Sequence, residues 1–554
     1  MRLRFGCVVL YLSALPVAAQ QPSRPLWGSL EPGPHQIGFR QLLLRDATRP
    51  QLATTDRPAL GEQPGRQLRV LLWYPAASGG TRLTYGDYIA LLAQRLDFTP
   101  ITAVRREAAI ADFVARSRAM GGDTTALHAA LPALLQTSVA ATLNARPAAG
   151  RFPLVIFPEW RSPASNSIMA EYLTSHGFAV ASVSLLGSYD DDVEWFAVRG
   201  IEALASDFAF VLSALDTVRY VDSRNAAAMG VGIAATGALA LQMRTPAIRA
   251  FVSLEGGITT EGEQRLLMRT PLFDIGRVNV PMLAITAPHP SVDAARLDLY
   301  RYAPRRIVHF PTMGEFWFLD YGMLERTIPR IIGPPPGNTV LGFEWGARIV
   351  ERFYSAHLKR DEDALRWLEA LTPPAAAPQL FSVRVRPATP APPSLAGFKR
   401  LIDSAGVSAI SAFVAARLPT DSAPIPNEYF TNLNAWLGEG RDRSGAQRHE
   451  LAALRVRMYP RSSRAHFALA ASALRMRDST SAREHVQHAM RLTSEDPDPL
   501  LDFPTRESIR RLGATLTPGA PAQAHADTSR VIVHQFTSQI LGDTRAIRVY
   551  LPRG

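Results

Sequence analysis

The residues whose spacing has the clearest chemical meaning lie in the stretch 226–241, which reads AAAMGVGIAATGALAL. A small apolar strand leads into the tight turn Gly230-Val231-Gly232, and an Ala/Leu-rich helix follows. A strand, a sharp turn and a helix form the frame of a nucleophile elbow, in which the serine of Gly-x-Ser-x-Gly stands at the apex. Here the apex is Gly232, between Val231 and Ile233. Because glycine has no side chain that could attack an acyl carbon, the stretch predicts the frame of a nucleophilic site without its nucleophile.

Such a turn needs a sheet to position it, and the sequence from residue 151 onward predicts one. Apolar strands alternate there with amphipathic helices, which is typical of a parallel sheet with helices on both faces. The expected strands are 153–157, 178–184, 226–229, 250–254, 281–286 and 306–310, and the expected helices are 167–176, 196–215 and 349–357. Upstream, 37–44 and 68–74 are expected to form an antiparallel pair added to this sheet. We therefore expect an α/β fold, with its chemistry at the carboxyl ends of the strands.

Residues 30–360 resemble the α/β-hydrolase superfamily, and in particular its platelet-activating-factor acetylhydrolase and dienelactone-hydrolase-like branch. The resemblance is carried by the entering strand 69–75, the strand 153–157, the helix and turn over 170–178, and the elbow. It implies the α/β-hydrolase fold and hydrolysis of a carboxylic ester. It also implies a serine, an acid and a histidine in that chain order, with backbone N–H groups that stabilise the oxyanion.

The three positions of that catalytic triad are all changed here. The serine position falls on Gly232, and the aspartate position, in a Ser-Leu-Asp context, falls on Glu255 after Ser253 and Leu254. The histidine position, in a Gly-His context before Phe-x-Asp, falls on Glu315. A glutamate can replace an aspartate only where there is a histidine to orient, so the resemblance implies a catalytically degenerate site.

The oxyanion loop also departs from the pattern that the resemblance implies. The loop that usually carries His-Gly reads Pro-Glu-Trp-Arg here and contains Glu159 and Trp160. With Val231 and Ile233 beside the elbow, these residues complete the expected oxyanion region and pocket. We expect no metal and no cofactor, and the ligand expected in this pocket is a small acyl ester or another hydrophobic molecule.

Two alternatives to a lost activity stay open. A displaced nucleophile would make the chain an active ester hydrolase, and the hydroxyl and imidazole groups near the expected site are those of Ser162, Ser165, Ser167, Thr236 and His289, the last near Asp293. Alternatively, the carboxylates of Glu255 and Glu315, with Glu159 nearby, could hold a cation or a basic ligand, or act as an acid/base pair.

Composition and the N-terminal sequence bear on location and partners. The formal charge of +11 comes almost entirely from arginine, which is scattered singly, so we expect no nucleic acid as partner. Residues 1–20 have the positive end, short apolar core and small residues of a secretory signal cleaved near Ala19 and Gln20, which predicts a periplasmic or secreted protein. The sole cysteine, Cys7, lies in this signal, and no later stretch is long and apolar enough to span a membrane.

The remainder of the chain is expected to form further units. The hydrolase-like domain is expected over 21–371, with 83–145 as a helical insertion that is either a cap or a plain covering pair. A proline-rich linker follows over 372–396, and a helical domain over 397–515. Ala470, Ala482 and Ala489 are spaced like the small residues of a tetratricopeptide repeat, which implies that these helices bind a protein.

The C-terminal segment 516–554 is expected to be a second linker and a β-hairpin. The residues Val549, Tyr550, Leu551 and Pro552 resemble the first strand of enterochelin-esterase-like domains. One interpretation is a truncated esterase domain, and the other is an ordinary terminal hairpin. Our first hypothesis for the whole chain is a degenerate hydrolase that acts as a binding or scaffold protein.

Overall fold

The computed structural model describes residues 26–49, 65–94, 99–159, 162–186, 196–496, 498, 500–501, 503–516, 530–538 and 543–551. The predicted export signal, Trp160 of the oxyanion loop and Pro552 lie outside the described residues.

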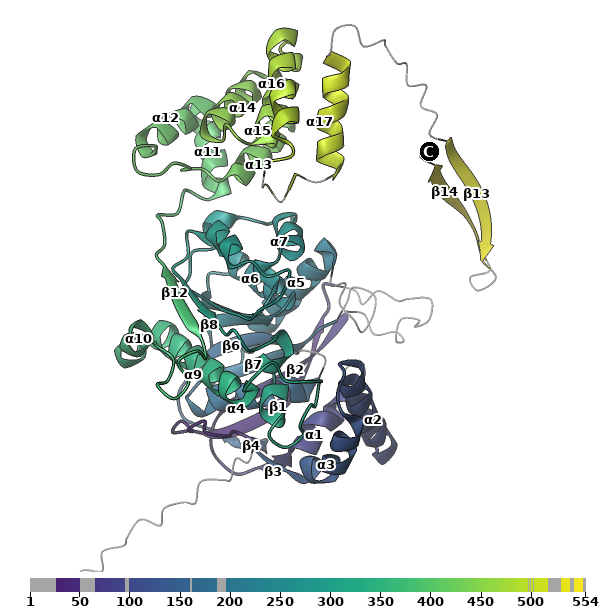
Figure 1. Cartoon of the computed structure of the whole chain (residues 1–554), viewed down its shortest axis with the longest axis vertical. Helices are drawn as coiled ribbons and strands as arrows, with labels where there is room; N and C mark the ends of the chain where they lie inside the picture. The colour runs from purple at the N-terminus through teal and green to yellow at the C-terminus, as the bar shows by residue number, and fades with distance from the viewer. Residues whose placement is uncertain are drawn as a thin grey trace, which may run out of the picture.

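A mixed, 12-stranded sheet forms the centre of the molecule (Figure 1). Its strands are β1 Gln36–Asp46, β2 Arg66–Ser78, β3 Thr81–Thr84, β4 Ser138–Leu143, β5 Arg146–Pro147, β6 Phe152–Glu159, β7 Ala179–Ser184, β8 Val221–Val231, β9 Ile248–Leu254, β10 Met282–Thr286, β11 Arg305–His309 and β12 Ser382–Arg386. They follow the order β12-β11-β10-β9-β8-β6-β7-β2-β1-β4-β3, and β5 pairs with β2. From β11 to β7 all neighbours are parallel, whereas β2 is antiparallel to β7 and to β1. The expected antiparallel pair is therefore present, and β4 and β3 extend the sheet beyond it.

Helices cover both faces of this sheet, and two separate apolar cores result. The helices are α4 Ser167–Ser175, α5 Val198–Leu215, α6 Ala234–Arg244, α7 Glu261–Met268, α8 Tyr321–Leu324, α9 Thr339–Leu358 and α10 Glu362–Glu369. Residues of α4 and α9 share one core, and residues of α5 and α6 share the other. Strand β8 contributes Ala227 and Met229 to the first core and Ala226 and Ala228 to the second, which is the alternation of a strand buried on both faces. This arrangement confirms the predicted α/β fold class.

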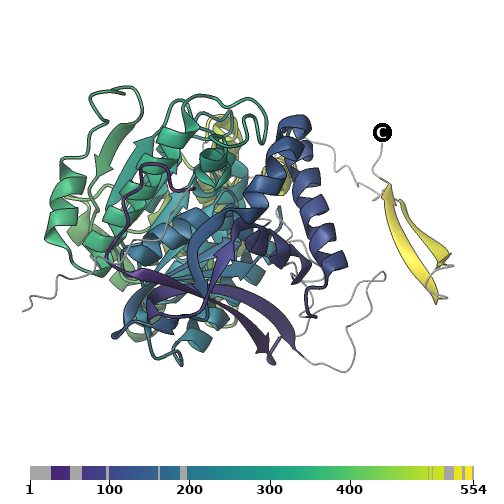
Figure 2. The same cartoon turned by 90° about the horizontal axis from the view of Figure 1, so that it is seen from below.

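The insertion over 83–145 begins in β3 of the sheet and includes β4 near its end. It contains α1 Tyr85–Ala90, α2 Ala103–Ala119 and α3 Thr124–Gln136, between β3 and β4. In both views these blue helices and the green α10 lie at opposite ends of the molecule (Figures 1 and 2), and all of them contribute residues to the core that α4 and α9 share. The hydroxyl of Tyr85 donates a 2.8 Å hydrogen bond to the carbonyl of Ala164, so α1 contacts the loop that follows β6.

The proline-rich segment is not a free linker throughout, because β12 lies within it and pairs antiparallel with β11. Beyond it come α11 Leu395–Ala405, α12 Val407–Arg417, α13 Asn427–Gly438, α14 Ala446–Met458, α15 Ser463–Arg475, α16 Ser479–Leu492 and α17 Phe503–Leu516. This helical domain packs on the core that α5 and α6 share, through Phe398, Tyr429 and Leu433. The Tyr429 hydroxyl also accepts a 3.2 Å hydrogen bond from the N–H of Gly276.

The paired helices α15 and α16 bury three of their alanines completely. Ala470, Ala482 and Ala489 each have 0% exposure, as expected where two helices approach closely. The C-terminal segment forms a hairpin of β13 Arg530–Ser538 and β14 Asp543–Leu551, paired antiparallel with each other. Both strands lie within the segment 516–554, where the sequence predicts a hairpin.

Candidate active site at the elbow

The elbow is formed as the sequence predicts, and it has glycine at its apex. Strand β8 ends at Val231, helix α6 begins at Ala234, and Gly232 between them has a φ of +52°. An added Cβ at Gly230 would lie 2.2 Å from the Cα of Ala235, so this position needs glycine for close strand–helix packing. Val231 and Ile233 are buried on either side of the apex.

The loop after β9 is hydrogen-bonded to the elbow. The N–H of Gly232 lies 2.8 Å from the carbonyl oxygen of Glu255 and 3.1 Å from that of Leu254. Glu255, Gly256 and Gly257 have φ values of +44°, +70° and +59°, so three successive residues are left-handed. A Cβ at Gly257 would lie 2.2 Å from the carbonyl oxygen of Gly232. This close backbone contact explains the glycines and places the acid position directly beside the apex.

The Glu255 carboxylate lies in an acidic, buried surrounding. The residue is 3% exposed, and the N–H of Glu255 is fixed by a 2.7 Å hydrogen bond to the carbonyl of Ile285. Burial raises the pKa of Glu255 to about 8, and the charges of Glu315 and then Glu263 contribute to the rise. Glu315 begins the short 3-10 helix Glu315–Phe318 in the loop after β11. The structure thus brings together Gly232 and Glu255 by backbone contact, and Glu255 and Glu315 by electrostatic interaction.

Glu159 lies at the end of β6, and one oxygen of its carboxylate is already engaged in an ion pair. It is 2% exposed and forms an ion pair with the fully buried Arg69 of β2. Its second carboxylate oxygen, Oε2, is buried and receives no hydrogen bond within the described part of the chain. The same holds for the Ser165 hydroxyl and the side-chain nitrogen of Asn166 in the loop that follows. Beside the expected oxyanion region, β6 and this loop therefore hold buried polar atoms that have no partner among the residues the structure describes.

Asp320, the aspartate of the expected Phe-x-Asp context, holds the beginning of α4. Its Oδ2 accepts a 2.6 Å hydrogen bond from the Ser167 hydroxyl and a 3.1 Å bond from the N–H of Ile168. The residue is fully buried, and burial raises the pKa of Asp320 to about 8. Asp320 thus has a structural role, and Ser167 is engaged by it.

The other candidates for a displaced nucleophile either form hydrogen bonds with neighbouring residues or are exposed to solvent. The Ser162 hydroxyl accepts from the N–H of Ala164 at 3.2 Å, and the Thr236 hydroxyl donates to the carbonyl of Ile233 at 2.6 Å. His289 is exposed, and its Nδ1 accepts from the N–H of Ser291 at 3.2 Å. Asp293 accepts from the N–H of Ala295 at 2.8 Å. Within the described ranges, none of these serines is hydrogen-bonded to a histidine.

One hydroxyl–imidazole pair at this edge was not anticipated from the sequence. The Thr286 hydroxyl lies 3.0 Å from Nδ1 of His309, and the two residues are opposite each other at the ends of β10 and β11. Burial, assisted by Arg384, lowers the pKa of His309, which favours the neutral imidazole that a general base requires. Both side chains line a cleft of about 630 Å³ that also includes His289 and Arg384. The pair results from the register between β10 and β11. Because the sequence does not show which residues of two strands lie opposite each other, it could not predict this pair.

The search for metal sites and membrane spans covers the described ranges only. No group of three or more His, Cys, Asp or Glu side chains in them is arranged to hold a metal ion. Among the helices of the described part, none is long and apolar enough to cross a bilayer.

No family model and no curated protein matches the sequence. Solved structures do resemble the chain, and one of them is a ferulic acid esterase from Streptomyces cinnamoneus. The two chains are 20% identical, the match covers 63% of this chain and 96% of that one, and the TM-score is 0.43. A likeness at this level identifies neither a substrate nor a reaction for this chain.

Proposed function

We propose that this hydrolase-fold chain has lost the esterase reaction and acts by binding. The observation that carries the proposal is Gly232 at the apex of a well-formed elbow, directly beside Glu255. The N–H of Gly232 is hydrogen-bonded to the loop after β9, so the turn has its full backbone geometry while the attacking side chain is missing. Removal of the nucleophile alone costs on the order of a million-fold in turnover in a well-studied serine protease. Glu315 at the histidine position supports the same conclusion.

The proposed role has two parts, each supported by a different region. The pocket expected beside the elbow would hold a small acyl ester or hydrophobic molecule without cleaving it, and the helical domain would bind a protein. Export through the segment 1–20 belongs to the same proposal. N-terminal sequencing of the protein recovered outside the cytoplasm should find a new end near Gln20, whereas an intact Met1 would contradict export.

Hydrolysis of short-chain p-nitrophenyl esters tests the loss of activity. The purified chain is assayed beside a Gly232→Ser variant, and both are treated with a fluorophosphonate that labels activated serines. We expect no turnover and no label in the natural chain. Turnover above the uncatalysed rate, or a labelled residue identified by mass spectrometry, would overturn the proposal.

A second candidate function rests on the pair Thr286 and His309. A threonine hydroxyl with a neutral imidazole at 3.0 Å has the arrangement of a nucleophile and its base. Under this alternative the chain is an active ester hydrolase, and Thr286→Val abolishes turnover while the chain still folds. If the natural chain hydrolyses no ester, the pair is structural and the first proposal stands.

A further inference from the structure

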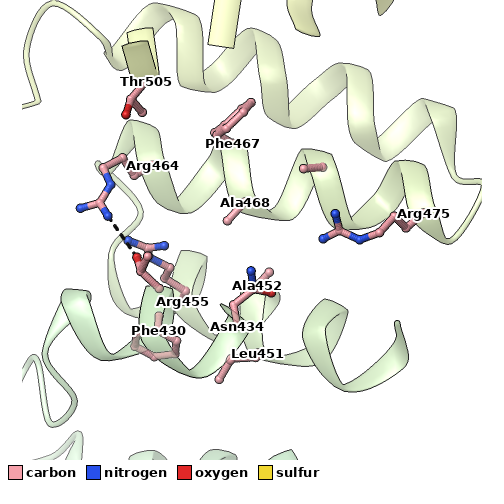
Figure 3. A pocket seen from close by; sticks show the side chains of 12 residues that line it. Phe430, Asn434, Leu451, Ala452, Arg455, Arg464, Phe467, Ala468, Arg475 and Thr505 are labelled. Carbon is pink, nitrogen blue, oxygen red and sulfur yellow. Dashed lines mark hydrogen bonds between the residues drawn. The ribbon is translucent and has the colours of Figure 1, made fainter. Parts of the chain in front are cut away.

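Two arginines that line a groove of the helical domain are already engaged within the protein. The groove, of about 280 Å³, opens between α13, α14, α15 and α17, and Arg455 and Arg464 lie at one end of it (Figure 3). Arg464 forms an ion pair with Asp498 at 2.9 Å, and Nε of Arg455 donates a 2.8 Å hydrogen bond to the side-chain oxygen of Asn427. A cleft beside the edge strand β12 of the sheet differs from this groove, because its arginine has no such partner.

This cleft, of about 630 Å³, lies where β10 and β11 end. Residues of the elbow and of the acid position do not belong to its lining, so the cleft is distinct from the pocket expected there. Apolar side chains of the loop after β10 form much of its wall, among them Pro288, Pro290 and Val292. The lining contains no carboxylate, and its polar groups come from a threonine, two histidines and one arginine.

Three neighbouring strands bring polar side chains to this cleft on one face of the sheet. Thr286 of β10 lies opposite His309 of β11. Arg384 of β12 lies opposite Ile307, two residues before His309. Because opposite residues share a face, as do alternate residues of one strand, Arg384, His309 and Thr286 are on the same face. Diagonal neighbours such as His309 and Arg384 lie about 7–8 Å apart, so one carboxylate can contact both.

Arg384 gives the cleft a positive charge that no ion pair neutralises within the described part of the chain. Its side chain is exposed, and its charge acts on His309. His289 is exposed as well, but Glu263, from outside the lining, acts on it electrostatically. The guanidinium of Arg384 is therefore the group in the lining that is best placed to attract an anion.

The pair Thr286 and His309 keeps one proton donor for a ligand. The hydroxyl of Thr286 lies 3.0 Å from Nδ1 of His309. If the hydroxyl donates to Nδ1, the neutral imidazole carries its proton on Nε2, and if Nδ1 donates to the hydroxyl oxygen, the hydroxyl proton remains. Burial lowers the pKa of His309, which favours the neutral imidazole. Either arrangement leaves one donor on the face that also carries Arg384.

We propose that this cleft binds a small organic carboxylate with an apolar body. The carboxylate would lie between the guanidinium of Arg384 and the pair Thr286 and His309, because guanidinium groups bind carboxylates with two parallel hydrogen bonds and the pair adds a third donor. The apolar body would pack on Pro288 and Pro290. The inference goes beyond the functions proposed above, since binding in this cleft requires neither the elbow nor the turnover of an ester.

A ligand-observed NMR titration of the full chain tests the proposal, with benzoate as the probe. Benzamide is the neutral control of nearly the same shape, and acetate is the control that keeps the carboxylate but lacks the apolar body. We expect saturable binding of benzoate that weakens with added salt. The affinity for each control should be lower by about fivefold or more, because each lacks one of the two kinds of contact.

Variants of the chain assign the binding to the cleft. Arg384→Gln should weaken the binding of benzoate about fivefold. The double variant Thr286→Val with His309→Phe removes both possible donors and should weaken it by about the same factor. Arg457→Gln, at an exposed position of α14 outside the cleft, should leave the affinity unchanged. Circular dichroism checks that the double variant folds, and the exposed Arg384 keeps the test valid if it does not.

The outcomes that overturn the proposal are equal binding of benzoate and either control, unchanged affinity in Arg384→Gln, and the absence of saturable binding. A loss of affinity in Arg457→Gln as large as that in Arg384→Gln overturns it too. Hydrolysis of p-nitrophenyl esters is measured on the same preparation. If benzoate does not bind and no ester is cleaved, this inference fails while the proposed loss of activity stands. If benzoate binds as expected and esters are cleaved, the inference stands while the loss of activity is contradicted.

Discussion

The backbone N–H of Gly232 donates a 2.8 Å hydrogen bond to the carbonyl oxygen of Glu255, and both residues have left-handed backbones. The apex of the elbow and the acid position are therefore fixed against each other by the main chain. Their geometry does not depend on the side chain at position 232. Under the proposed loss of activity, this main-chain contact keeps the frame of the elbow in place without a serine at position 232.

Replacement of Gly232 by alanine or serine should destabilise the chain, because a φ of +52° is unfavourable for residues with a Cβ. The expected loss is about 1–2 kcal/mol in the free energy of unfolding, measured by urea denaturation. Gly262→Ala, at a site where a Cβ would meet nothing within 4 Å and no left-handed φ occurs, is the matched control. A Gly232→Ala variant as stable as the natural chain would contradict the strain.

The stability of the chain should fall as the pH rises from about 4.5 to about 8. Glu255 titrates near its ordinary value of 4.5 when unfolded, but its folded pKa is raised to about 8. Between these values the folded chain holds a proton that the unfolded chain has released, so raising the pH favours unfolding. The slope from one such group is at most about 1.4 kcal/mol per pH unit.

Glu255→Gln should remove that part of the slope, as measured by urea midpoints at pH 5.5, 6.5 and 7.5, values chosen to span roughly this window. A residual slope should persist, because Asp320 also has its pKa raised to about 8. Glu362→Gln, at an exposed carboxylate, should not change the slope. A natural chain that becomes more stable from pH 5.5 to 7.5 would show that the Glu255 carboxylate is ionised when folded.

Substitution of Asp207, a buried residue of α5, should strongly lower the free energy of unfolding. Its two oxygens each accept a 2.7 Å hydrogen bond from Arg66, which is 3% exposed, and Arg49 lies 2.8 Å from Oδ1. Asp207→Asn leaves the buried Arg66 without its carboxylate, so we expect a loss of about 3–5 kcal/mol. Chemical denaturation measures it, with the exposed Asp403→Asn as control. A loss below about 1 kcal/mol would mean that solvent reaches Arg66.

Enlarging Ala470 to leucine should disturb the pairing of α15 and α16. The side chain is fully buried, and overpacking of such sites costs about 1–3 kcal/mol. Hydrogen exchange of the amides in these two helices should quicken, while exchange in the central sheet should not. Ala405→Leu, at an exposed helical position, is the control. Unchanged exchange in α15 and α16 would show that the contact has room for a larger residue.

Much of the fold could be predicted because local patterns determine it. The apolar runs 153–157 and 250–254 lie within β6 and β9, as expected because short apolar runs bounded by turns are typical of central strands. The elbow followed from its glycines. The strands β3, β4 and β12 were missed, because each is short or partly exposed and forms only through pairing with a distant strand.

The candidate site, like the fold, was only partly predictable from the sequence. The sequence by itself determined that position 232 has no nucleophile, since residue type decides that chemistry whatever the fold. Only the tertiary structure decided that Glu255 is buried near other carboxylates and that Thr286 faces His309. These properties depend on register, desolvation and the approach of residues far apart in the chain, which no local pattern of residues records.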